Sequence, residues 1–563
     1  MDWKTGYRPM KPSSKVCPQL DRAESDRMSL TMRPFGLVVA ALALLCSVSC
    51  GPGKFSSQAQ TGKAGVFRYS IVTNPTTMDP HMAQDGDTLD LLQQVYEGLV
   101  GWDTNNRPVG YLAEKWDLSP DGKTYTFTLK SNAKFHNGRQ VTADDVKWSF
   151  ERTSNPKLAS PVSDAYLSDI EGFTEKFSGK AKEVSGVKAI DSSHVSITLK
   201  APNRAFLGKL TYLAAAVVPK EVFPEDRQIS EVSQMVGSGP FKVKSYQPDQ
   251  LIVLDAFPEY HDGAPKLKTI ERWVIGDPVT RLNKFKNNEI DLVQLERQDV
   301  STLQKDPKFK DQLHFFPRPS IWYIGLNQRM YAPFKDKRVR QAIAMSIDKE
   351  KIVNEQLEGI NTVANSIVPP GVPGGDRKDA KSFKYDPEAA KKLLAEAGYP
   401  GGKGLPPLTL TFRENRPDIK IVAEAAASQI YANLGLEVKL QTMEWGSYLT
   451  QYNAKKQTFF HMRWAADYVD PENFLSHMLA TWGPENKIGY DNPEFDSLCR
   501  KADAERELEA SLPYYAQAED VVLQDAVWIP IYFQRDAELI SPRVKGLRES
   551  IFGHLPHTTV EVE

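Results

Sequence analysis

One short stretch of the sequence, RWAADYVDPENFL, sets carboxylates among aromatic rings. In this stretch Asp467 lies between Trp464 and Tyr468, where an apolar strand has no use for a charge. A carboxylate in a dry, aromatic site favours a fixed cation, because charge-assisted hydrogen bonds are strong. The alternative is that Asp467 caps a helix beginning near Pro471, but Asp470 directly precedes the proline and suits that position better. Asp467 is therefore left without an evident structural role.

No common catalytic motif accompanies this carboxylate. The sequence has no glycine-rich phosphate loop of either usual spacing, no histidine pair on one helix turn with a glutamate, and no CxxC. The segment GSGPF, at 237–241, leads into KVKSY and is interpreted as a turn before a strand. The histidines are isolated, and His461 is the one next to the acidic, aromatic stretch. We expect no catalytic residues, no bound metal and no cofactor.

The N-terminal region has the features of an export signal. In MRPFGLVVAALALLCSVSC, Arg33 precedes an apolar run from Phe35 to Leu45. That run is much shorter than the ~20 residues needed to span a bilayer, so it predicts a secretion signal, with translation starting after residue 27. SVSC followed by a Gly/Ser/Gln stretch is similar to a bacterial lipoprotein processing site, with Cys50 as the acylated first residue, although Ser47 replaces the usual leucine. The alternative is a cleaved signal without a lipid.

Composition and pattern indicate a soluble α/β protein of several domains. The chain has 563 residues, 41% hydrophobic and 25% charged, with a formal net charge of -2. This charge gives no reason to expect nucleic acid as a partner. Strand-like segments such as KTYTFTLK alternate with helical ones such as DPEAAKKLLAEAG, and we expect Asp386 and Asp418 to cap two helices. Cys499 remains unpaired in the exported part, so no structural disulfide is expected.

Several dispersed segments together resemble the family 5 solute-binding proteins of ABC importers, which include dipeptide-, oligopeptide- and nickel-binding proteins. The most specific is LAEKWDLSPDGKTYTFTLKSNAKFHNGRQVTADDVKWSFER, from Leu112 to Arg152. Others are TMDPH, the segment from GSGPF to ERWVI, IGLNQRMYAPFKDKRVRQAIAMSIDKEKIV, and PIYFQRDAELISPRVKGL. The resemblance covers the chain from about Val66 to the C-terminus.

The resemblance implies an α/β fold of the class II periplasmic-binding-protein type, in which two lobes and an extra subdomain enclose the ligand. An N-terminal extension with the signal peptide at 1–50 and a flexible tether at 51–65 would precede the folded part. The resemblance implies these further boundaries: lobe I at 66–97, 236–320 and 529–563, its subdomain at 98–235, and lobe II at 321–528.

The resemblance also assigns roles within the acidic, aromatic stretch. WAADYVDP is similar to the oligopeptide-binding branch, in which the aspartate at the position of Asp467 pairs with the α-ammonium of a peptide. The backbone just before it, at Arg463 and Ala465, would hydrogen-bond the peptide as an added strand, a mode that accepts any side chain. Trp464 and Tyr468 would wall the cleft.

On the opposite lobe, the segment QDGD aligns with a loop that contacts the peptide backbone. Gln84, Asp85 and Gly86 are therefore candidate ligand contacts. The oligopeptide branch tends to carry an acidic residue where this chain has Gln84.

The function implied is that of a non-enzymatic, monomeric, extracytoplasmic carrier. It would capture a peptide, close around it and deliver it to an ABC permease with a cytoplasmic ATPase, while a lipid anchor at Cys50 holds it to the membrane. Two alternatives remain open: the same transport role with a nickel chelate, oligosaccharide or opine, or an enzyme or ligand sensor on the same fold.

Overall fold

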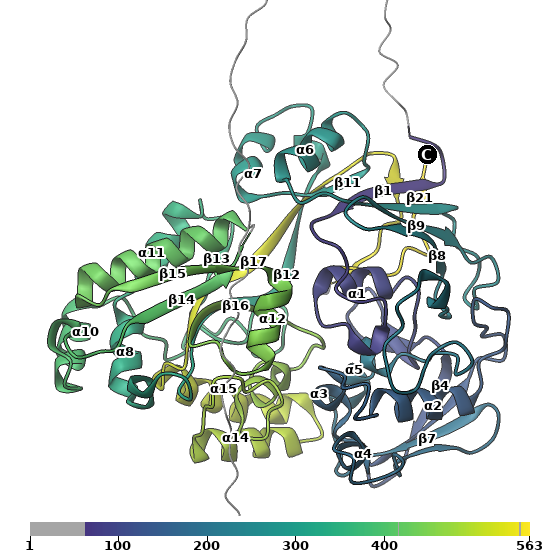
Figure 1. Cartoon of the computed structure of the whole chain (residues 1–563), viewed down its shortest axis with the longest axis horizontal. Coiled ribbons are helices and arrows are strands. Elements are labelled where there is room, and N and C mark those ends of the chain that lie inside the picture. Colours follow the sequence, from purple (N-terminus) through teal and green to yellow (C-terminus); the bar gives the residue numbers. More distant parts are fainter. Residues whose placement is uncertain (1–61, 415, 551–552) are drawn as a thin grey trace, which may run out of the picture. The chain divides into compact units, whose positions relative to one another are not determined.

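The computed structural model describes residues 62–414, 416–550 and 553–563 of the chain (Figure 1). The predicted signal segment and the candidate acylation site Cys50 lie outside these residues. Over the described ranges, no helix combines the length and the apolar character that a bilayer crossing requires.

The fold is built around one mixed sheet of eleven strands, in the order β15-β14-β16-β12-β17-β11-β1-β10-β9-β8, with β13 paired to β17. We call the end from β11 to β8 the first lobe and the end from β15 to β16 the second lobe. Parallel and antiparallel pairs mix within the sheet, and helices lie between the strands, so the predicted α/β fold is confirmed. The strands are β1 Val66–Ile71, β8 Phe241–Gln247, β9 Leu251–Ala256, β10 Thr269–Val274, β11 Leu292–Gln294, β12 Leu313–Leu326, β13 Thr362–Val363, β14 Leu408–Arg413, β15 Val438–Met443, β16 Phe459–Ala465 and β17 Trp528–Ile540.

A smaller sheet forms a subdomain between β1 and β8 in the chain, with the order β4-β5-β7-β6. Strand β5 buries every second side chain, Tyr125, Phe127 and Leu129, as its alternating sequence predicts. Helix α2 begins with a capping box, in which Thr142 and Asp145 satisfy each other's backbone amides. The subdomain elements are β2 Val100–Trp102, β3 Pro108–Gly110, β4 Ala113–Leu118, β5 Thr124–Leu129, α2 Ala143–Thr153, α3 Ser163–Leu167, α4 Phe173–Phe177, β6 Val187–Ala189, β7 His194–Thr198 and α5 Phe206–Lys209.

Helix caps in the second lobe follow the sequence with one exception. Asp386 caps α10 and accepts a hydrogen bond from the backbone amide of Ala389 at 3.0 Å. The predicted cap at Asp418 is wrong, because α11 begins at Pro417 with Arg416 as its N-cap. The Asp418 carboxylate instead accepts a hydrogen bond from Arg297 of the first lobe at 3.0 Å. The remaining helices are α1 Gly86–Leu92, α6 Pro278–Lys286, α7 Arg297–Leu303, α8 Lys337–Met345, α9 Lys349–Lys351, α10 Pro387–Glu396, α11 Pro417–Leu434, α12 Trp445–Asn453, α13 Ser476–Leu479, α14 Pro493–Ala504 and α15 Leu508–Gln524.

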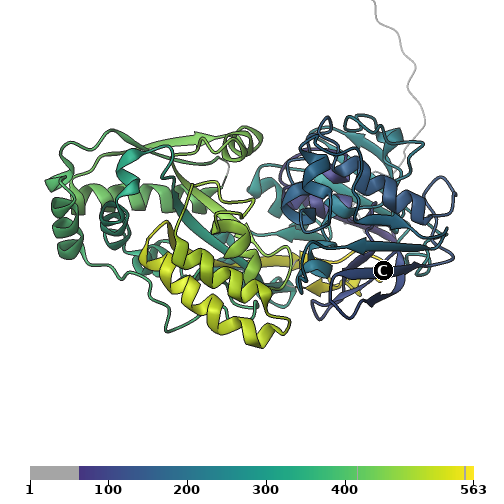
Figure 2. The ribbon, with the colours of Figure 1, turned by 90° about the horizontal axis from the view of Figure 1, so that it is seen from below.

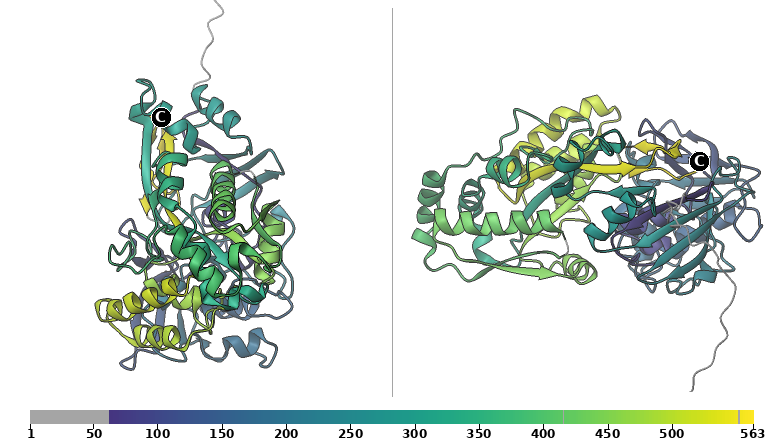
Figure 3. Two further views of the ribbon diagram at one scale, coloured as in Figure 1. Left: turned by 90° about the vertical axis from the view of Figure 1, so that its left-hand side faces the viewer. Right: turned by 90° about the horizontal axis from the view of Figure 1, so that it is seen from above.

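Strands β12 and β17 connect the two lobes. They pair with each other along most of their length, and β17, the long yellow strand in Figure 3, also pairs with β11 of the first lobe. Pro317 and Ile321 of β12 pair with Arg535 and Phe533 of β17, and the register of the two strands shifts between these pairs. A bulge of this kind bends a strand locally.

Helices α14 and α15, the yellow-green pair in Figure 2, pack together on the second lobe.

Candidate ligand cleft

A cavity of about 480 Å³ is lined by residues of the first lobe, the subdomain and the second lobe. Its walls come from the loop before α1, from tyrosines of the subdomain, and from the strands β12, β16 and β17. Because both lobes contribute, the cavity depends on how closely they approach.

The loop before α1 forms the first-lobe wall. Asp85 caps α1 by accepting from the backbone amide of Thr88 at 3.1 Å, and it also accepts from the Thr76 hydroxyl at 2.6 Å. The Gln84 carboxamide oxygen accepts a hydrogen bond from Asn453 of α12 at 2.8 Å, which links the two lobes. The carboxylate of Asp85 is therefore engaged within its own loop.

The second-lobe wall is the end of β16 and the loop that follows it. The Asn473 side-chain oxygen accepts from the indole of Trp464 at 3.1 Å and from the backbone amide of Asp467 at 3.2 Å, which fixes the loop. Asp470 is the N-cap of the short 3-10 helix Pro471–Asn473 and accepts from the amide of Glu472. Asp467 therefore does not cap this helix, as the sequence indicates.

The Asp467 carboxylate is half-buried and lies in the cleft without an ion-pair partner among the described residues. It accepts a hydrogen bond from the hydroxyl of Tyr166 of the subdomain at 2.6 Å. Among the described residues, no lysine, arginine or histidine forms an ion pair with it. Burial raises its pKa to about 7, against the lowering effects of the Tyr166 hydrogen bond and the nearby charge of Arg463. A carboxylate in this setting gains strongly from a cation that arrives with a ligand.

Aromatic side chains form the floor between β12, β16 and β17. The Trp322 ring stacks on His461 at 5.3 Å and on Tyr532 at 5.7 Å between centroids. Both ring nitrogens of His461 are buried and lack a hydrogen-bond partner within the described part of the chain. Burial lowers the pKa of His461 to about 3, so the imidazole is neutral.

Seven of the eight ligand contacts expected from the sequence line this cavity: Gln84, Asp85, Gly86, Arg463, Trp464, Ala465 and Asp467. The structure places Tyr468 elsewhere, because its ring is buried in the core of the subdomain and its hydroxyl donates to Glu472. Tyr166, Trp322 and Arg413 also line the cavity, and no sequence motif marks them. His461, which only its position beside the stretch singles out, lines it as well.

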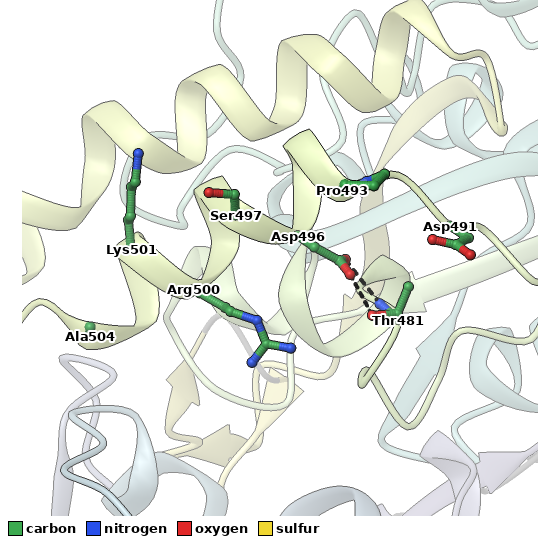
Figure 4. Close-up of a pocket in the computed structure, with 8 residues that line it drawn as sticks. All are labelled: Thr481, Asp491, Pro493, Asp496, Ser497, Arg500, Lys501 and Ala504. Carbon is green, nitrogen blue, oxygen red and sulfur yellow. Dashed lines mark hydrogen bonds between the residues drawn. The ribbon is translucent and has the colours of Figure 1, made fainter.

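A second hollow, on α14, is open to solvent and is a poor candidate for a ligand site. Asp496 there accepts hydrogen bonds from the amide and hydroxyl of Thr481 (Figure 4). Most of its lining side chains are exposed, and Arg500 lies on the ring of Trp482 at 3.8 Å. Its charges are solvated or satisfied, whereas the half-buried Asp467 carboxylate in the cleft has no ion-pair partner among the described residues.

Comparison with known proteins identifies the class. Residues 107–486 match the model of the bacterial extracellular solute-binding proteins, family 5, and the chain belongs to this family. The dipeptide-binding protein DppE of Bacillus subtilis is 30% identical over 533 residues, covering 92% of this chain and 96% of that protein. Heme-binding protein A of Haemophilus influenzae is also 30% identical, over 94% of this chain and 97% of its own.

Solved structures show the same fold. Haemophilus influenzae OppA in complex with RPPGFSPFR has a TM-score of 0.80 and 25% identity, covering 89% of this chain and 100% of that one. The murein tripeptide-binding protein MppA of Escherichia coli, at 26% identity over 89% of this chain and 98% of its own, gives 0.80 in one structure. Its unliganded open form, with the same identity and coverage, gives 0.65. The arrangement of lobes in this chain therefore differs more from that open form.

Proposed function

We propose that this protein binds peptides in the cleft and delivers them to the permease of an ABC importer. The observation that carries the proposal is the half-buried carboxylate of Asp467, which has a hydrogen-bond donor in Tyr166 but no ion pair with any cation of the described residues. The α-ammonium of a peptide supplies such a cation. Relatives named for dipeptides and a neighbour solved with a nonapeptide support the peptide as ligand.

The free edge of β16 supports binding of the peptide main chain. Its neighbour β14 pairs with β16 only at Phe459 and Phe460, so in the described residues the edge from His461 to Ala465 has no strand partner on that side. An extended peptide can hydrogen-bond along this edge at Arg463 and Ala465 whatever its side chains. Asp467 then lies just beyond the end of the edge, where the peptide's N-terminus would sit.

We propose that the lobes close around the ligand, with lobe I at 66–97, 236–320 and 529–563, a subdomain at 98–235, and lobe II at 321–528. The bulge of β12 at Pro317 to Ile321 supports a bend between them, since the two connecting strands change register there. The direct hydrogen bonds between lobes, and the lower TM-score to an open relative, support a closed arrangement in this structure.

Calorimetry tests the peptide proposal. Asp467→Asn should weaken the binding of a free-amine peptide by roughly 1.5–3 kcal/mol, the range for a hydrogen bond to a charged group. N-acetylation of the peptide should cost the wild type a similar amount. Asp496→Asn, in the hollow on α14, is the matched control and should change nothing. Equal binding of acetylated and free peptides would contradict the role of Asp467.

The identity of the natural ligand is tested separately, by mass spectrometry of molecules retained through gentle purification. A mixture of intact peptides supports the proposal, and its recovery without cleavage supports a carrier that catalyses nothing. A single other solute would favour a different cargo, as the relative named for heme illustrates. We further propose a monomer that is attached to the membrane through acylated Cys50.

A further inference from the structure

One carboxylate at the contact between the subdomain and the second lobe differs from its neighbours. Arg204 of the subdomain pairs with Asp470 of the second lobe at 2.9 Å. Lys209, also of the subdomain, pairs with Glu472 at 3.2 Å. Asp467 lies three residues before Asp470, and within the described chain it has no ion-pair partner. It is therefore the exception along this loop, where the two later carboxylates are compensated.

Tyrosines of the subdomain meet the Asp467 carboxylate. The hydroxyl of Tyr166 donates to it at 2.6 Å, and the ring of Tyr166 stacks on Tyr212 with 3.9 Å between centroids. Burial raises the pKa of both phenols well above the ordinary value, so neither is charged. His477 of the second lobe lies 5.5 Å from the Tyr166 ring, and burial lowers its pKa well below the ordinary value. The rings around the carboxylate are thus neutral.

The charged groups near Asp467 do not balance it. Burial raises the pKa of Asp467 most strongly, hydrogen bonding lowers it, and the charges of Glu485 and Arg463 act in opposite directions. Glu485 itself pairs with Lys487 at 3.1 Å. On the first-lobe side, Asp85 adds a negative charge near the tyrosine pair. Among these described groups, none forms an ion pair with Asp467.

Opening of the lobes would place the Asp467 carboxyl in water. Tyr166 belongs to the subdomain and Asp467 to the second lobe, so their separation breaks the hydrogen bond and hydrates both groups. A hydrated aspartate has a pKa of about 3.9, whereas burial in the closed cleft raises the pKa of Asp467 to about 7. The closed state therefore holds a proton on Asp467 more tightly than the open state does. By linkage, the proton favours the closed state.

We infer that protonation of Asp467 closes the cleft without a ligand. The proton takes the place of the cation that a ligand brings, because a neutral carboxyl keeps the hydrogen bond from Tyr166 and carries no charge into the closed cleft. Acid thereby withdraws the open form to which a ligand binds. The inference rests on the proposed closure of the lobes, extends it to the ligand-free protein, and applies to any cationic ligand.

The pH range of this switch follows from the pKa values of the two states. The closed-to-open ratio is constant at alkaline pH, rises as the pH falls through 7, and levels off below about pH 4, where both states are protonated. Relative to alkaline pH, the ratio should increase about tenfold at pH 6 and about a hundredfold at pH 5. Most of the change therefore lies between pH 7 and 5.

Small-angle scattering on the ligand-free chain measures closure between pH 5 and 8. Retained ligand is removed beforehand by unfolding and refolding the protein. The wild type should have a smaller radius of gyration at pH 5 than at pH 8. Asp467→Asn carries a neutral amide with the shape of the protonated acid, and its oxygen still accepts from Tyr166, so this variant should be compact at both pH values.

Infrared difference spectra identify the group that takes up the proton. Between pH 8 and 5 the wild type should gain a protonated-carboxyl band that Asp467→Asn lacks. Asp503 and Glu519, whose pKa values are also about 7, remain in that variant, so their contribution cancels in the comparison. Asp496→Asn, in the hollow on α14, is the matched control and should behave as the wild type in both measurements.

Two results overturn the inference. One is a radius of gyration of the wild type that stays constant from pH 5 to 8, and the other is an Asp467→Asn variant that opens at pH 8 as the wild type does. Peptide binding tests the proposed function separately. Acid compaction that depends on Asp467, in a protein that binds no peptide, would refute the peptide as ligand and keep the proton switch. Peptide binding without acid compaction would do the reverse.

Discussion

Affinity for a peptide with a free amine should fall as the pH drops below 7. The Asp467 carboxyl must be ionised to pair with an ammonium, and burial raises its pKa to about 7 in the unliganded cleft. Binding below this pH therefore has to release a proton. At higher pH the carboxylate is already charged, and no proton is released from it.

The size of the effect follows from the pKa. The apparent dissociation constant rises by a factor of 1 + 10^(pKa − pH), which is about 2 at pH 7, about 10 at pH 6 and about 100 at pH 5. Each pH unit below the pKa of Asp467 lowers the binding free energy by about 1.4 kcal/mol. Above pH 8 the α-amine of the peptide itself loses its proton, so affinity should decline again and the profile should have a maximum between about pH 7 and 8.

Calorimetry from pH 5 to 9 measures this profile, and a comparison of buffers with different ionisation enthalpies counts the proton released. Asp467→Asn should bind the peptide weakly, and its affinity should change little between pH 5 and 7. An N-acetylated peptide should give the same flat limb with the wild type. The variant is needed as a control because Asp503 and Glu519, outside the cleft lining, also have pKa values of about 7. A flat acidic limb in the wild type, or a steep one that survives in Asp467→Asn, would refute the reasoning.

Three further predictions concern closure and attachment. Tyr166→Phe removes the hydroxyl that donates to Asp467 at 2.6 Å, and titration calorimetry should show at least tenfold weaker peptide binding. Arg204→Met removes the pairing of the subdomain with Asp470 at 2.9 Å, so the closed state should be destabilised by about 2 kcal/mol. Peptide affinity should then fall about 30-fold, and small-angle scattering at sub-saturating peptide should show a larger radius of gyration. Cys50→Ser should move the protein from the membrane fraction to the soluble fraction, or leave the precursor uncleaved, without changing its affinity for peptide. Recovery of the wild type as a soluble protein without acyl mass would rule out the anchor.

Local patterns were sufficient to predict several elements of this fold. The alternation in KTYTFTLK predicts β5, because a half-buried strand needs an apolar side chain at every second residue. The capping box at Thr142 and the cap at Asp386 depend on residues within three positions, and the structure has both. Asp470 rather than Asp467 caps the turn at Pro471 for the same local reason.

Contacts between distant segments could not be predicted in this way. Tyr166 and Asp467 are separated by 301 positions and meet only when the subdomain faces the second lobe. Asp418 looks like a helix cap in sequence, but the nearby Arg297 of the first lobe takes its carboxylate. Tyr468 follows Asp467 directly and yet points into the subdomain core, since the chain has left β16 and no longer alternates toward the cleft.

The loop after β16 carries both the proposed ligand anchor and several contacts with the subdomain. Asp467 accepts from Tyr166, and three residues later Asp470 receives both hydrogen bonds of the Arg204 fork. Glu472 pairs with Lys209, the neighbouring cation of the subdomain. All three acceptors lie within six residues, and Asn473 accepts a hydrogen bond from the amide of Asp467, so we expect an ammonium that orders Asp467 also to order the groups that bind the subdomain. Ligand and closure then stabilise each other reciprocally, and a variant that weakens the Arg204 contact must lower affinity without touching the ligand.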